Sequence, residues 1–124
     1  MPRTSLVLYR DEDGNTSFLD WFEHIPQQAQ YRCQARLKLL AEQGHELRRP
    51  AADYLRDGIY ELRARSERVH YRILYFFHGR QMVVISHGFT KQQSAVPPEE
   101  IERALRRKAS FKSDPAKHTH VEAT

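Results

Sequence analysis

Residues 59–77, IYELRARSERVHYRILYFF, combine the pattern of two β-strands with a high density of charge. Arginine donates paired hydrogen bonds to phosphate, and histidine gains or loses a proton near neutral pH. Gathered in one place, such side chains suit phosphate binding combined with proton transfer. The charged and histidine residues of this stretch are Glu61, Arg63, Arg65, Glu67, Arg68, His70 and Arg72.

Alternation along the first strand separates charge from apolar side chains, because successive residues point to opposite faces of a sheet. Leu62 and Ala64 suit a face that packs on a core, and the charged residues between them share the opposite face. A two-residue turn at 66–67 would pair Arg63 with His70 in the next strand. Cross-strand partners lie on the same face, so the charge of both strands is expected on one side.

A second two-residue turn, at 78–79, would extend this face to a third strand. It would pair His70 with His87 and Arg72 with Ile85. Together the two turns predict one cluster of charged and histidine side chains on a single face. Its expected members are Glu61, Arg63, Arg65, His70, Arg72, His87 and Lys91.

Two interpretations of this face remain open. It is either a phosphate-binding site or a solvated surface on which Glu61 and Arg72 form an ordinary cross-strand ion pair. Apolar residues also occupy the face, so we expect its ends to be covered, in part by a C-terminal helix. These apolar residues are Leu74, Phe76, Val83, Ile85 and Phe89.

The remaining elements predict an α+β fold, with an N-terminal strand, two helices on one face of a small antiparallel sheet, and a C-terminal helix. Ser17 and Asp20 resemble a capping box, and 45–55 is expected to be a connector with one helical turn. Residues 1–112 are expected to form a single domain and 113–124 a disordered tail. The predicted elements are a strand at 4–10, helices at 17–25 and 27–43, strands at 58–65, 69–77 and 81–90, and a helix from Pro98 to Lys108.

Composition narrows the functional class. The chain has 124 residues, 20 basic and 16 acidic, with a net charge of +4, which permits a nucleic-acid partner without requiring one. Its one cysteine, Cys33, excludes an intrachain disulfide and suits a reducing compartment. No signal peptide or membrane-spanning run is evident, so we expect a cytoplasmic protein without a membrane partner. His118 and His120 do not form a set with other histidine, cysteine or carboxylate residues at the spacing of metal ligands, so no metal or other cofactor is expected.

Four short pieces of the sequence, in order, resemble the RelE/HigB toxin superfamily and are closest to its phage-derived HigB-like branch. Within residues 55–105 the similarity is clear, and the two upstream helices are also similar. The four pieces are Gly58–Arg63 (GIYELR), Tyr71–Tyr75 (YRILY), His87–Lys91 (HGFTK) and Pro98–Ala104 (PEEIERA).

The resemblance implies a RelE/ParE-like fold and the toxin of a type II toxin–antitoxin pair. Such toxins cut mRNA, typically in the A site of the small ribosomal subunit, without a metal. A helix-turn-helix antitoxin encoded beside the toxin neutralises it, and operator DNA is contacted only through that antitoxin. Arg63 and Arg72 would be the cations that stabilise the phosphate and the transition state, and Lys91 matches the first of two family lysines. Gln92 stands in the second place. Glu61 occupies a position where the better-studied RelE branch tends to have a base such as lysine, so the general base stays open.

RNA can be cut when its own 2′-OH attacks the adjacent phosphorus, which leaves a 2′,3′-cyclic phosphate and a 5′-OH. This endonuclease chemistry needs a base, an acid and cations for the charge on the phosphorane. His87 or His70 could transfer protons, beside the cations Arg63 and Arg72. Expected RNA contacts come from Arg65, Arg68 and His70.

A different functional class also fits the same superfamily. The chain could be a non-nuclease member, either a toxin that poisons DNA gyrase by binding or a corepressor that binds DNA only with its antitoxin. The fold is shared by these branches and does not decide between them. The set Arg63, Arg72 and His87 favours the nuclease, an inhibitor of translation.

Overall fold

The computed structural model of the chain describes residues 4–91 and 95–121. A short 3₁₀ turn, Gly44–Glu46, is present besides the α-helices and strands. The α-helices and strands, in chain order, are β1 (Ser5–Leu8), α1 (Ser17–His24), α2 (Gln27–Gln43), β2 (Ala52–Arg56), β3 (Ile59–Ser66), β4 (Val69–His78), β5 (Met82–Lys91) and α3 (Pro98–Ser113).

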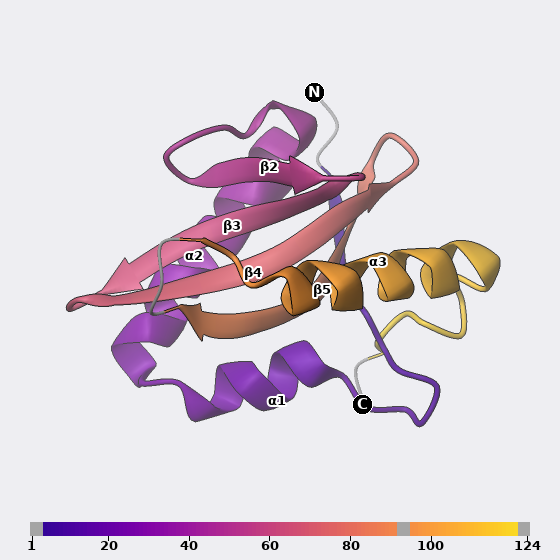
Figure 1. Cartoon of the computed structure of the whole chain (residues 1–124), viewed down its shortest axis with the longest axis horizontal. Helices are drawn as coiled ribbons and strands as arrows, with labels where there is room; N and C mark the ends of the chain where they lie inside the picture. Colours follow the sequence, from indigo (N-terminus) through magenta and orange to yellow (C-terminus); the bar gives the residue numbers. More distant parts are fainter. Residues whose placement is uncertain (1–3, 92–94, 122–124) are drawn as a thin grey trace.

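One five-stranded sheet, in the order β1-β5-β4-β3-β2, organises the molecule. β2 to β5 form an antiparallel meander, and β1 joins β5 in parallel. In Figure 1, α2 passes behind the sheet while α3 crosses in front of it, and α1 runs beside β5. The predicted α+β class is confirmed, with the two N-terminal helices and the C-terminal helix on different faces.

The two faces bury different cores. Leu62, Ala64 and Ile73 belong to the larger core, which α1 and α2 cover through residues such as Phe18 and Leu40. The smaller core lies under α3. It contains Tyr9, Ile59, Leu74, Phe76, Val84, Ala104 and Phe111. The expected cover by the C-terminal helix is therefore confirmed for Leu74 and Phe76.

β2 was not predicted, because residues 45–55 were expected to be a connector with one helical turn after Pro50. The structure instead closes a hairpin between β2 and β3 at Asp57 and Gly58. Both residues have positive φ, 52° and 84°, as type I′ turns require. The Asp-Gly dipeptide between two short apolar runs was the signal for this hairpin.

The register of the sheet differs from the predicted one. The first turn lies at Glu67 and Arg68 rather than at 66–67, so Arg63 pairs with Arg72 and not with His70. A shift of two residues leaves every side chain on its predicted face, because the side-chain period of a strand is two. The next turn is also longer than predicted, since β4 ends at His78 and β5 begins at Met82.

A bulge at Ser86 changes the facing of the first half of β5. Leu74 pairs with His87, whereas Tyr75 pairs with Ile85, so one residue of β5 is left over. Val83 and Ile85 therefore join the core under α1 and α2, which corrects their predicted place on the charged face. Sequence alternation alone does not reveal a single extra residue of this kind.

The helix ends agree with the sequence in part. Gly44, with φ 53°, ends α2 at the predicted position. The capping box predicted from Ser17 and Asp20 does not form. Thr16 is the N-cap of α1, and it makes no side-chain capping bond.

The last described residues do not follow the expectation of a disordered tail. Residues 114–121 return to β1, where Thr119 forms a bridge with Tyr9. The ring of His118 stacks on Tyr9 with centroids 5.0 Å apart, and only 3% of His118 is exposed. The Arg10 amide donates to the His118 carbonyl at 2.9 Å. The stacking of His118 on the buried Tyr9 joins segments distant along the chain, which is why a local sequence pattern did not predict it.

Candidate active site

The face of the sheet that carries α3 has an apolar half and a charged half. α3 covers the apolar half, and the charged half lies along the ends of β3, β4 and β5 near the β3–β4 turn. Cross-strand rows place Arg63 beside Arg72 and Arg65 beside His70, and His70 is also opposite Lys91. The alternation argument therefore brought the right side chains to one face, although with different partners.

Glu61 is a buried carboxylate at the base of this charged half, with 1% of the residue exposed. Its Oε1 accepts a hydrogen bond from Arg63 Nε at 2.7 Å, and its Oε2 lies 3.5 Å from Arg72 Nε. The predicted Glu61–Arg72 ion pair is thus present, but diagonally, because Glu61 stands opposite Leu74. One acid therefore orients two arginines.

β2 contributes a second acid that the sequence did not predict. Asp53 Oδ2 lies 3.2 Å from Arg63 Nη2 and 2.7 Å from Arg49 Nη2. The Arg49 side chain holds the pKa of the Asp53 carboxyl below its usual range, chiefly by that hydrogen bond. Arg63 is therefore held by carboxylates on two sides, whereas Glu61 is the only acid paired with Arg72 in the described part of the chain.

Arg72 is a buried cation with incomplete hydrogen bonding. Its side chain is 9% exposed, and its Nη1 donates to the Tyr71 carbonyl at 3.2 Å. Neither its Nε nor Oε2 of Glu61 has a hydrogen-bond partner among the described residues. Burial lowers the pKa of the Arg72 guanidinium. The negative charge of Glu61 raises this pKa, and the positive charge of Arg63 lowers it further. An arginine with spare donors beside a second arginine is an arrangement that suits a phosphate oxygen.

Lys91 and His70 lie at the edge of the arginine pair. Burial lowers the pKa of Lys91, and the charge of Arg72 lowers it further. The exposed imidazole of His70 also has a lowered pKa, because of partial desolvation and then the nearby charges of Arg72, Arg65 and Lys91. His70 is therefore mostly neutral at pH 7 and can accept a proton, while the lowered pKa makes charged Lys91 a stronger proton donor.

His87 occupies a different environment from His70. It is 2% exposed, and burial lowers its pKa to about 3. Its Nε2 lies 3.1 Å from Glu100 Oε1 in α3, and its Nδ1 lies 2.8 Å from Ser86 Oγ. A neutral ring satisfies both contacts when Nε2–H donates to the carboxylate and Nδ1 accepts from the hydroxyl. The structure therefore places His87 under α3 and leaves His70 as the accessible histidine of the charged half.

The predicted RNA contacts lie toward the end of the β3–β4 hairpin. Arg65 and Arg68 are exposed, and Arg68 stands in the turn itself. Neither forms an ion pair with any residue in the ranges 4–91 and 95–121. Gln92, which replaces the second family lysine, lies outside the described residues.

Histidine and carboxylate side chains do not gather as three metal ligands anywhere in the described residues. His118 Nδ1 lies 2.8 Å from the Arg10 carbonyl, and His120 Nδ1 lies 2.9 Å from Thr16 Oγ1. Of the helices that the structure describes, none has both the length and the apolar character needed to cross a membrane.

Residues 20–109 match the family described as phage-derived Gp49-like proteins. The matched region begins in α1, ends in α3 and includes every residue of the charged half. The chain belongs to this family. The Gp49-like family is of the RelE/HigB type and is associated with toxins of toxin–antitoxin systems, which points to an antitoxin as a partner. No curated protein matches the chain significantly.

Proposed function

We propose that this Gp49-like protein is a type II toxin that cuts mRNA on the ribosome, in the cytoplasm, until an antitoxin neutralises it. The observation that carries the proposal is the arginine pair, in which buried Glu61 orients the partly exposed Arg63 beside the buried Arg72. A balanced structural ion pair would use one arginine. Here Arg63, Arg72 and Lys91 outnumber the acids Glu61 and Asp53, which leaves a surplus positive charge where a phosphate can bind.

The proposed reaction uses the 2′-OH of the RNA as nucleophile. His70 accepts the proton of the 2′-OH as its oxygen attacks phosphorus, and the bond from phosphorus to the 5′-oxygen breaks. Lys91 donates a proton to that leaving oxygen, and the two arginines stabilise the charge on the phosphorane. Arg65 and Arg68 would contact neighbouring phosphates. The products are a 2′,3′-cyclic phosphate and a 5′-OH.

The test is growth under tight induction, combined with mapping of 5′ ends in cellular mRNA. Arg72→Ala should abolish both growth arrest and new cuts within translated codons, since losing a transition-state cation costs about 10²–10³ in rate. His70→Gln and Lys91→Met should each slow cutting, and His87→Gln should slow it less. Arg32→Ala is the matched control, because Arg32 is an exposed arginine of α2.

Three results would count against the proposal in different ways. Arrest without cuts would indicate a toxin that acts by binding, such as a gyrase poison. Cuts that persist in Arg72→Ala would exclude the arginine pair as the site. Absence of arrest with soluble protein would indicate a member that lacks toxicity, such as a corepressor.

A further inference from the structure

The outer edge of β5 is only half covered. β1 pairs with β5 as far as Ile85, whose carbonyl accepts from the Tyr9 amide at 3.0 Å. At the bulge, the Ser86 carbonyl accepts from Arg107 Nη1 at 2.8 Å instead of from a strand. Within residues 4–91 and 95–121, no strand pairs with this edge between Ser86 and Lys91.

Two residues of this edge present backbone donors and acceptors outward. Backbone groups alternate between the two sides of a strand. Because the Ser86 carbonyl points away from β4, the alternation directs the N–H and C=O groups of Gly88 and Thr90 the same way. Edges of this kind invite pairing with another strand, and proteins usually cover them.

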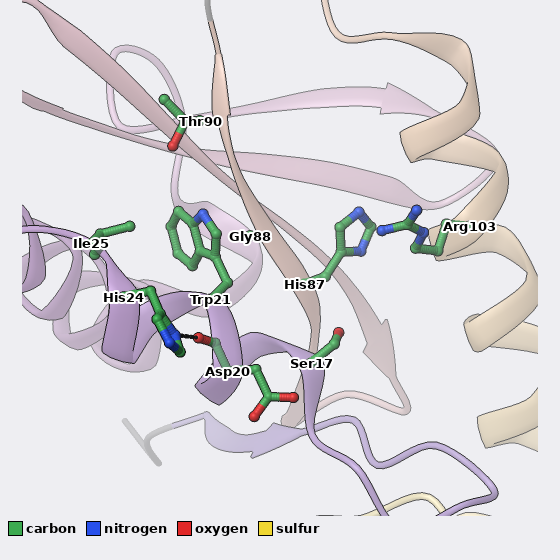
Figure 2. A pocket seen from close by; sticks show the side chains of 9 residues that line it. All are labelled: Ser17, Asp20, Trp21, His24, Ile25, His87, Gly88, Thr90 and Arg103. Carbon is green, nitrogen blue, oxygen red and sulfur yellow. Dashed lines mark hydrogen bonds between the residues drawn. The ribbon is translucent and has the colours of Figure 1, made fainter.

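A groove lies along this edge, between α1 and α3. Gly88 and Thr90 line a hollow of about 610 Å³ together with Arg103 of α3 and with residues of α1 and its C-cap. The residues from α1 and its C-cap are Ser17, Asp20, Trp21, His24 and Ile25, and His87 of β5 also lines the hollow. Figure 2 shows β5 running between the two helices, with Trp21 on one side and His87 and Arg103 on the other. The α1 side of the groove therefore combines the apolar side chains of Trp21 and Ile25 with polar ones, Asp20 among them, and the α3 side presents a basic wall, formed by Arg103.

The basic wall continues past Arg103. A second hollow of about 280 Å³ shares Arg103 and is lined by Arg106, Arg107 and Asp11 as well. Arg103 is 51% exposed and lies 3.7 Å from Glu100, and Arg107 lies 3.5 Å from Asp11. Three arginines thus face one aspartate in this hollow. Burial lowers the pKa of Arg107, and repulsion from Arg103 and Arg106 lowers it further, although Asp11 opposes this.

The two walls define what can occupy the groove. Side chains of an added strand alternate between the two faces of the sheet. Those on one face would meet Trp21 and Ile25, and those on the other would meet Arg103. We propose that the groove binds an extended segment of the antitoxin, with apolar residues alternating with acidic ones, as a strand added to β5. The identity of the partner rests on the proposed function, because an antitoxin is expected only for a toxin.

The first test measures binding of a defined probe to the full chain. The probe is a fluorescein-labelled eight-residue peptide of alternating valine and glutamate, and binding is followed by anisotropy. Arg103→Glu and Thr90→Pro should each weaken binding by at least about tenfold, because one reverses the basic wall and the other removes an outward N–H donor. The matched controls Arg32→Glu and Thr90→Val keep the wall and the donor, and they should bind within about twofold of the original chain.

A second test needs no variant. In the free chain, the amides of Gly88 and Thr90 should exchange with deuterium faster than that of Phe89, which faces β4. The peptide should slow both of these amides by at least about tenfold, as expected when an open edge becomes paired.

Several outcomes would overturn this proposal. They are absence of peptide binding up to about 1 mM, equal binding of a valine–lysine peptide, and protection that avoids Gly88 and Thr90. Displacement of the peptide by single-stranded RNA, with RNA binding also weakened in Arg103→Glu, would assign the groove to RNA instead.

Growth arrest and mRNA cutting by the chain alone test the proposed function separately. Arg103→Glu should retain both, and it should resist neutralisation by the antitoxin. If the chain causes no arrest but binds the peptide, the toxin assignment fails while the groove stands. If the chain causes arrest but does not bind the peptide, the groove fails while the toxin assignment stands.

Discussion

Neutralising Glu61 should destabilise the folded chain strongly, because Glu61 is the acid paired with buried Arg72. The side chains of Glu61 and Arg72 are 2% and 9% exposed, and the charged atoms are 3.5 Å apart. At an effective dielectric constant of about 20, this attraction is about 5 kcal/mol, most of which offsets the cost of removing both ions from water. In Glu61→Gln the cost of removing the Arg72 cation from water remains, whereas its attraction to the Glu61 carboxylate is lost.

The expected loss in the free energy of unfolding is about 3 kcal/mol for Glu61→Gln, at the low end for breaking a buried pair. The low end applies because Arg72 Nε and Glu61 Oε2 are not hydrogen-bonded. Urea unfolding can be followed by the fluorescence of Trp21, the one tryptophan of the chain. With a slope of about 2 kcal/mol per M, the midpoint should fall by about 1.5 M.

The double variant Glu61→Gln/Arg72→Met separates the ion pair from other effects. Because it also removes the unpaired cation, it should be more stable than Glu61→Gln by about 1–3 kcal/mol. Glu99→Gln, at an exposed position in the first turn of α3, is a control expected to change stability by less than about 0.5 kcal/mol. The reasoning would be refuted if Glu61→Gln changed the free energy of unfolding by less than about 0.5 kcal/mol, or if the double variant were no more stable than Glu61→Gln.

Two further perturbations test the packing around β5. The pKa of His87 is lowered to about 3 in the folded chain, so the unfolded chain takes up its proton first as the pH falls. The contribution of His87 to the free energy of unfolding is therefore complete above about pH 6.5, and it falls by about 1.4 kcal/mol per pH unit below that. Urea unfolding at pH 7 and pH 5.5 should show this loss in the original chain, and His87→Gln should remove the part that His87 causes. Gly88→Ala would place a Cβ against the ring of Trp21. It should therefore lower the free energy of unfolding by about 1–3 kcal/mol and alter the tryptophan fluorescence of the native state. Unchanged stability and fluorescence would show that Trp21 does not pack against Gly88.

The face on which each residue lies was predictable from the sequence, and the cross-strand partners were not. Alternation fixes which side chains share a face, and a slip of two residues preserves it. The position of a turn depends on which residues accept unusual dihedral angles. Glu67, with φ 55°, takes a left-handed conformation that its residue type does not favour. The turn was therefore placed one residue too early, and Arg72 became the partner of Arg63 only in the structure.

Long-range packing accounts for what the sequence did not reveal about the site. The accessibility of a histidine depends on the elements that cover it, and α3 covers His87 through Glu100 while leaving His70 exposed. Asp53 escaped notice because its strand was read as a connector. In both cases the missing information is a contact between segments distant along the chain, which local patterns do not contain.

We propose that the charged half of the sheet serves the binding of an anion rather than the stability of the fold. Around Glu61, the cations Arg63, Arg72 and Lys91 outnumber the acids, and of these three Asp53 pairs only with Arg63. Burial lowers the pKa of both Arg72 and Lys91, and repulsion from other cations lowers each of them further. A surface selected for stability alone would pair each cation or replace it with a neutral residue. A bound phosphate would relieve the repulsion between these cations. The same contacts that disfavour the empty site therefore favour the occupied one.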